Sequence, residues 1–132
     1  MGVQTVNPAT GEVIKDYDFM SEQHIEDVIA QAHNAFQDWR KMPLSEREAL
    51  MGKAAEVLKK NKEEYAALIT KEMGKSITSA RAEIDKCASI CEHYSKNTSK
   101  YLEPRIVKTE MSKSQVTYEP RGPIFSIMPW NF

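Results

Sequence analysis

Apolar side chains recur every three or four residues through most of the first hundred positions, which is the spacing of one face of an α-helix. Four such stretches follow one another, and proline, asparagine and glycine residues interrupt them. Each stretch is predicted to bury one apolar stripe and to expose its charged side. The predicted helices cover residues 21–42, 45–60, 62–73 and 76–103. Their apolar stripes include Ile25, Phe36 and Trp39, then Leu50, Ala54, Val57 and Leu58, then Leu68 and Met73, then Ile84, Cys87, Ala88 and Cys91.

Polar residues mark where these helices begin and end. Ser21 and Ser76 are predicted N-caps, because a serine hydroxyl accepts a hydrogen bond from a free N–H of the first turn. Ser45 and Glu48 have the spacing of a capping box. Gly74 stands where a left-handed residue ends the third helix.

Three other segments have the pattern of strands. Residues 5–14 carry turn signals between Pro8 and Gly11 and predict a small hairpin or an extended arm. Residues 106–118 alternate loosely and predict a long hairpin. The apolar run 124–128 follows a break rich in proline and glycine and is typical of a buried parallel strand.

The predicted fold class is α/β, in the order arm, four helices, hairpin and first buried strand of a larger sheet. The predicted division is an arm and helical part at 1–104, a hairpin at 105–120, and the start of a strand at 121–132. A buried parallel strand needs neighbours on both edges. The chain ends at Phe132 without supplying them, so we expect a fragment of a longer protein.

Composition narrows the function classes. The 132 residues are 41% hydrophobic and 28% charged, which is typical of a globular chain. A net charge of -1 gives no single-sign field, so neither nucleic acid nor an anionic membrane is expected as a partner. The longest apolar runs are far shorter than a membrane span. With two cysteines and no secretory signal, we expect a cytoplasmic protein.

The two cysteines, Cys87 and Cys91, lie four residues apart in the fourth predicted helix, close to His93. A structural metal would need about four ligands, and no second pair of ligands is at hand. We expect both thiols to be buried as small hydrophobic groups and expect no metal; a metal ligand or a nucleophile is the alternative.

A polar amide, Asn131, lies just past the carboxyl end of the predicted strand at 124–128. Ligands of open α/β sheets bind outside the carboxyl ends of the strands. An asparagine there can donate hydrogen bonds to a developing oxyanion, although asparagine is also an ordinary turn residue.

Six ordered segments resemble the amino-terminal portion of the aldehyde dehydrogenase superfamily. The last segment is the most specific, and the helical pieces at 72–75 and 80–83 look most like the succinate-semialdehyde dehydrogenase branch. The segments are Asn7–Glu12, Ala35–Arg40, Ser45–Arg47, Glu72–Lys75 with Ala80–Glu83, Tyr118–Pro123 and Ile127–Phe132.

The resemblance implies oxidation of an aldehyde, such as a semialdehyde, with NAD or NADP through a cysteine thioester. It implies that Asn131 contributes to the oxyanion hole. It also implies that Ile127, Met128, Pro129 and Trp130 line the cofactor cleft.

The resemblance further implies a homo-oligomer formed through the 106–118 hairpin. The family's nucleophilic cysteine and catalytic glutamate match no residue of this sequence, so the 132-residue chain alone is expected to be inactive. The alternative is a stand-alone helical module that binds a partner without catalysis.

Overall fold

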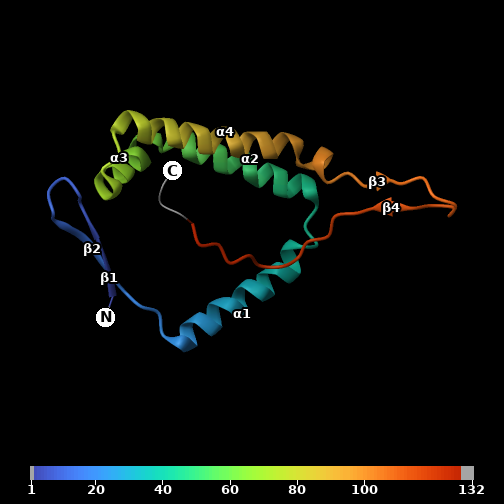
Figure 1. Cartoon of the computed structure of the whole chain (residues 1–132), viewed down its shortest axis with the longest axis horizontal. Helices are drawn as coiled ribbons and strands as arrows, with labels where there is room; N and C mark the ends of the chain where they lie inside the picture. Colours follow the sequence, from blue (N-terminus) through green and yellow to red (C-terminus); the bar gives the residue numbers. More distant parts are fainter. Residues whose placement is uncertain (1, 129–132) are drawn as a thin grey trace. The chain divides into compact units, whose positions relative to one another are not determined.

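A computed structural model describes residues 2–128 of the chain (Figure 1). These residues form two compact units. Within the described residues, the first unit comprises 2–19 and 43–102, and the second comprises 20–42 and 103–128. No helix among the described residues is long and apolar enough to cross a membrane.

The first unit begins with a two-stranded ribbon. Strands β1 (Gly2–Val6) and β2 (Val13–Asp18) pair antiparallel, with a register shift between Thr5 and Val6. The turn between them closes on Asn7, whose carbonyl accepts a hydrogen bond from Gly11 N at 2.8 Å. Gly11 has φ 77°, a conformation that glycine adopts without steric cost. The predicted amino-terminal hairpin is confirmed.

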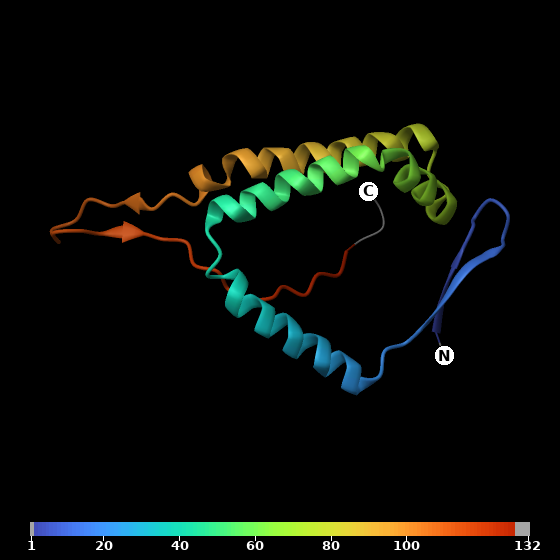
Figure 2. The ribbon, with the colours of Figure 1, turned by 180° about the vertical axis from the view of Figure 1, so that it is seen from behind.

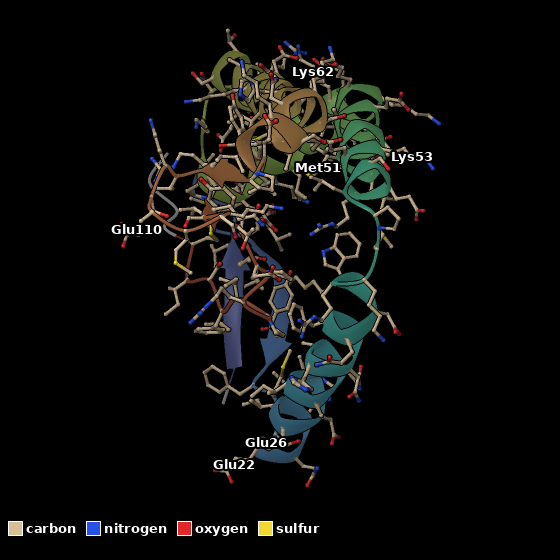
Figure 3. All side chains as sticks on the ribbon, turned by 90° about the vertical axis from the view of Figure 1, so that its right-hand side faces the viewer. Glu22, Glu26, Met51, Lys53, Lys62 and Glu110 are labelled. Carbon is tan, nitrogen blue, oxygen red and sulfur yellow. The ribbon has the colours of Figure 1, made fainter. Side chains whose placement is uncertain are left out.

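Three helices make up the rest of this unit: α2 (Leu44–Lys60), α3 (Lys62–Met73) and α4 (Ile77–Tyr101). Figures 1 and 2 show α2 and α4 side by side, with α3 at the end where α4 begins. The second unit contains α1 (Glu22–Trp39), whose amino end carries Glu22 and Glu26 (Figure 3), and the ribbon of β3 (Arg105–Ile106) and β4 (Gln115–Val116).

Small residues form the interface between the three helices of the first unit. The buried side chains are Ala55, Ala66, Ala80, Ile84 and Ala88. Side chains this small let helix axes approach closely. A Cβ added to Gly52 would lie 3.1 Å from Ser95 Oγ on α4, which shows how near α2 and α4 run.

Several of the larger apolar residues in the predicted stripes are about half exposed, which corrects those stripes in part. Leu50 is 41% exposed, Val57 49% and Leu68 50%, and Cys87 is also exposed. In α2 the buried residue is Ala55 rather than the predicted Ala54, and in α4 the buried face carries the alanines at 80 and 88. Ile84 and Ala88 are buried as predicted.

The predicted caps are confirmed at both serines and wrong at the capping box. Ser21 Oγ accepts a hydrogen bond from His24 N, and Ser76 Oγ accepts one from Ser79 N. Helix α2 instead begins after Pro43, without a side-chain cap. The carboxylate of Glu48 accepts hydrogen bonds from Ser99 N at 2.6 Å and from Ser99 Oγ at 2.8 Å. The carboxylate of Glu48 therefore bonds to Ser99 on α4, and not to the first turn of α2 as the capping-box pattern predicted.

Gly74 ends α3 in the left-handed conformation with φ 68°, as predicted. A Cβ added there would lie 2.9 Å from Cγ of Pro8, in the turn of the β1–β2 ribbon. We expect Gly74→Ala to lower the free energy of unfolding by about 1–2 kcal/mol, because alanine resists this conformation. The measurement is urea unfolding followed by circular dichroism.

Gly11→Ala is the matched control for Gly74→Ala. Gly11 also has a positive φ, but nothing lies within 4 Å of its added Cβ. If both variants lose the same stability, the contact with Pro8 contributes nothing and only backbone strain remains.

Candidate functional site

The segment that leads to the predicted site turns sharply at Gly122. This residue has φ 130°, which side chains other than glycine rarely adopt. Prolines at 120 and 123 stiffen the chain on either side of it. The segment therefore arrives at residue 124 with a direction set by the backbone.

Of the five predicted site residues, two lie in the described part of the chain. Ile127 is 84% exposed and Met128 is 79% exposed. Pro129, Trp130 and Asn131 lie outside the described residues. The two apolar side chains are thus available for contact with a further molecule or chain segment.

The prediction of a buried strand at 124–128 is wrong for the described structure. These residues belong to no strand, and Phe125 is 90% exposed. A strand forms only when its N–H and C=O groups pair with a neighbouring strand. The described chain contains only two-stranded ribbons, β1–β2 and β3–β4, and neither pairs with this run.

The predicted hairpin at 106–118 is present but short. β3 and β4 pair through backbone hydrogen bonds over two residues each, with Arg105 opposite Val116. The loop adds a hydrogen bond from Val107 N to Ser114 O at 2.9 Å. Most of the predicted hairpin is therefore loop. The hairpin carries two exposed apolar side chains, Ile106 on β3 and Met111 in the loop.

A hollow of about 270 Å³ lies in the second unit, between the carboxyl end of α1 and the turn at Gly122. It is lined by Ala32, Ala35, Phe36, Trp39, Gly122 and Pro123. Figures 1 and 2 show the segment after β4 passing this end of α1. Sequence reasoning missed the hollow, although two alanines on the aromatic face of α1 were a signal for close approach of another chain segment.

The cysteines do not form a site with other ligands in the described residues. Cys87 and Cys91 are both free on α4, the first exposed and the second half-buried. No group of three or more metal-binding side chains occurs among the residues that the structure describes. The predicted burial is thus wrong for Cys87, since the alanine face of α4 turns it outward.

The side chains whose pKa values are shifted in the folded chain lie on the helices of the first unit. Arg81 Nε and Nη2 donate to Glu63 Oε2 at 2.9 and 2.7 Å, and these hydrogen bonds hold the pKa of Glu63 below its ordinary value. A hydrogen bond from Lys59 likewise lowers the pKa of Glu92. Lys62 pairs with Asp85, so several ion pairs join α4 to the preceding helices.

We expect the stability of this unit to fall as acid protonates Glu63. Its pKa is lowered in the folded chain, so its contribution is present above the unfolded value of about 4.3 and is lost as pH falls through the folded value. Between pH 6 and pH 3, Glu63→Gln should therefore lose less stability than the unsubstituted chain. The measurement is the urea midpoint at each pH.

Glu64→Gln is the control for this effect, since Glu64 occupies the same first turn of α3 and shares its exposure to the helix dipole. This variant should keep the steeper pH dependence. An equal change in both variants would assign the effect to the helix terminus rather than to the pair with Arg81.

Comparison with known proteins gives a consistent result. The whole chain, residues 1–132, matches the aldehyde dehydrogenase family. It is 39% identical over 132 residues to a probable succinate-semialdehyde dehydrogenase [NADP(+)] of Synechocystis sp., covering 100% of this chain and 29% of that protein. It is 37% identical over 128 residues to succinate-semialdehyde dehydrogenase [NADP(+)] of Deinococcus radiodurans, covering 97% of this chain and 27% of that protein.

Solved structures agree with the sequence match. The chain superposes on succinic semialdehyde dehydrogenase from Streptococcus pyogenes, solved in complex with NADP+, with a TM-score of 0.81 and 34% identity. The superposition covers 86% of this chain and 25% of that one. The chain belongs to the aldehyde dehydrogenase family, which confirms the resemblance. It spans less than a third of the length of these curated relatives.

Proposed function

We propose that this chain is part of an NAD(P)-dependent aldehyde dehydrogenase that oxidises succinate semialdehyde or a similar semialdehyde to the carboxylate. Membership of the family carries the proposal. The substrate class follows from the relatives that are 39% and 37% identical, a probable and an assigned succinate-semialdehyde dehydrogenase.

The segment 127–131 is the proposed entry to the active site. The side-chain amide of Asn131 would donate a hydrogen bond to the oxyanion that forms when a thiolate attacks the aldehyde. Such a donor acts more strongly on the transition state than on the neutral carbonyl, so it accelerates the step.

The cofactor residues in this proposal are Ile127, Met128, Pro129 and Trp130. Ile127 and Met128 are largely exposed within the described chain, so both side chains are available to contact the cofactor. NAD or NADP, when bound, supplies the acceptor for the hydride of the aldehyde.

We further propose that the 132 residues do not turn over aldehyde by themselves. Cys87 and Cys91 are the cysteines of the chain, and both lie on α4 in the first unit. Neither falls in a segment that resembles the family's nucleophile. Assembly into a homo-oligomer would use the 106–118 hairpin, whose exposed strand edges can pair with another sheet.

A fusion protein tests the proposal directly. Residues 1–132 of this chain replace the matched part of the Synechocystis relative, and the product is assayed with succinate semialdehyde and NADP. We expect reduction of NADP by the fusion and none by the 132-residue chain. A folded fusion that leaves NADP oxidised, beside an active parent enzyme, would contradict the proposal.

A stand-alone interaction module is the second candidate. The exposed apolar side chains of α2 and α4 favour it, among them Leu50 at 41% and Tyr94 at 48% exposure. Such a module should be a monodisperse species whose exposed apolar faces bind a hydrophobic dye, and a matching partner should lower that dye binding. Self-association of the isolated chain would favour the dehydrogenase proposal.

A further inference from the structure

We propose that Arg47, near the amino end of α2, is the anchor for a carboxylate of an Asp or Glu side chain in the rest of the full-length dehydrogenase. The inference rests on the proposed function in one respect, namely that the chain is part of a longer enzyme. The chain spans less than a third of the length of its curated relatives, so such an enzyme has ample further chain to supply the carboxylate.

The side chain of Arg47 is half-buried and its Nε is unsatisfied. This atom exposes less than 1 Å² and has no hydrogen-bond partner among the described residues. A guanidinium keeps its proton in proteins, so it cannot become neutral when it is withdrawn from water. A buried N–H without an acceptor destabilises the fold. We therefore expect an acceptor for this group in the complete protein.

The neighbours of Arg47 on α2 cannot supply that acceptor. Residues three or four positions apart face each other on a helix surface. Around Arg47 these positions hold Pro43, Leu44, Leu50 and Met51, and none of these side chains accepts a strong hydrogen bond. Figure 3 labels Met51, which lies one turn further along α2. The guanidinium therefore arises from an apolar patch of its own helix.

The carboxylates of the first unit that could approach Arg47 are occupied elsewhere. Glu48 follows it directly, but its carboxylate accepts hydrogen bonds from Ser99 N and Oγ. Adjacent residues of a helix do not face each other, which also sets Glu46 apart. The acidic side chains of α4 each pair with a lysine: Glu83 with Lys75, Asp85 with Lys62, and Glu92 with Lys59.

The amino end of α2 favours an anion for a second reason. This end has no side-chain cap, and the free N–H groups of a first turn carry the positive end of the helix dipole. Helical side chains lean toward the amino end, so the guanidinium of Arg47 lies toward that first turn. A cation there is disfavoured by the dipole unless an anion accompanies it. One carboxylate would satisfy both the guanidinium and the helix end.

Arg81 shows how a paired arginine of the same unit is satisfied. Its Nε and Nη2 donate to Glu63 Oε2 at 2.9 and 2.7 Å. The planar guanidinium matches a carboxylate with two parallel hydrogen bonds, which makes a carboxylate the best acceptor for Arg47 as well. Because Nε of Arg47 has almost no contact with solvent, an acceptor built into the fold suits it better than an ion that exchanges with water.

The test compares Arg47→Met in the fusion protein and in the 132-residue chain. Methionine keeps an apolar stem of similar reach but removes the charge. In the fusion, loss of the guanidinium leaves a buried carboxylate unpaired, so the melting temperature at a fixed scan rate should fall by roughly 5 °C. In the 132-residue chain the carboxylate is absent, so the urea midpoint should stay unchanged or rise. Equal losses in both proteins would overturn the proposal.

Two variants serve as controls for Arg47→Met. Arg81→Met removes an arginine whose partner, Glu63, lies within the first unit, so it should lower stability alike in the fusion and in the 132-residue chain. Arg47→Lys keeps the charge but loses the two-pronged donor, so the fusion should lose only part of the melting temperature. If Arg47→Met prevents folding of the fusion, Arg47→Lys decides the question by the same comparison between the two proteins.

A double-mutant cycle then identifies the partner. Each Asp and Glu that the Synechocystis relative contributes to the fusion is replaced by its amide, alone and together with Arg47→Met. One position should show a loss that largely disappears when Arg47→Met is present. Additive losses at every acidic position would overturn the proposal.

Other occupants of the site would give different results. If inorganic phosphate raised the urea midpoint of the 132-residue chain but not that of its Arg47→Met variant, the occupant would be a free anion. If Arg47→Met lowered the mass of the fusion assembly in light scattering, the partner would be a second copy. Either result would overturn the proposal. A folded fusion that leaves NADP oxidised would contradict the proposed function, whereas the melting temperatures would still decide the role of Arg47.

Discussion

Replacing Asn131 by alanine in the fusion protein is expected to lower kcat by about 10²–10³, the largest effect predicted for this chain. The amide is the proposed donor to the oxyanion, and loss of one such donor costs about 2.7–4 kcal/mol of transition-state stabilisation. KM for the aldehyde should change little, because the neutral carbonyl gains much less from the bond than the oxyanion does. Steady-state kinetics with NADP in excess measures both constants.

Two further variants serve as controls for Asn131→Ala. Asn131→Asp keeps the size but places a carboxylate against the developing negative charge, so it should be at least as slow as the alanine variant. Asn97→Ala removes an amide that bonds to the carbonyl of His93 on α4, and it should keep the full rate. A raised KM with unchanged kcat for Asn131→Ala would mean that the residue is an ordinary turn asparagine or aids binding alone.

Ala88→Leu is expected to lower the free energy of unfolding of the first unit by about 1–3 kcal/mol. Ala88 is 0% exposed on α4, in a helix interface formed mainly by alanine. Three added carbon atoms have no space there, so the helices must separate or the side chain must leave its preferred rotamer. The measurement is the urea midpoint at constant m-value.

Ala82→Leu is the matched control for Ala88→Leu. Ala82 lies on the same helix, has the same side chain and is exposed. Its replacement should change the free energy of unfolding by no more than about 0.5 kcal/mol. If both leucine variants were equally stable, the alanine interface would not be a close-packed core.

The sequence predicted much of the fold because much of it is local. Helix ends at Ser21, Ser76 and Gly74 depend on hydrogen bonds and backbone angles within a few residues. The same holds for the turn at Asn7–Gly11. Where a distant group competed, as Ser99 does for Glu48, the local prediction failed.

The candidate site was predictable only as a pattern of residues. The order of short segments indicated the family, which comparison confirms over residues 1–132. The roles of Ile127 to Asn131 stay predictions. The run at 124–128 shows the limit of the method, since an apolar pattern indicates a strand but cannot provide the neighbours that a strand requires.

The sequence by itself determined the helices, most of their ends, the amino-terminal ribbon and the family, because these depend on neighbouring residues and on a recognisable order of segments. Only the tertiary structure decided which face of each helix is buried. The buried faces carry mainly alanine rather than the larger apolar residues, because helices pack most closely where their side chains are small. The tertiary structure also brought Gly122 to the end of α1, since a contact between residues some ninety positions apart leaves no periodic signal in the chain.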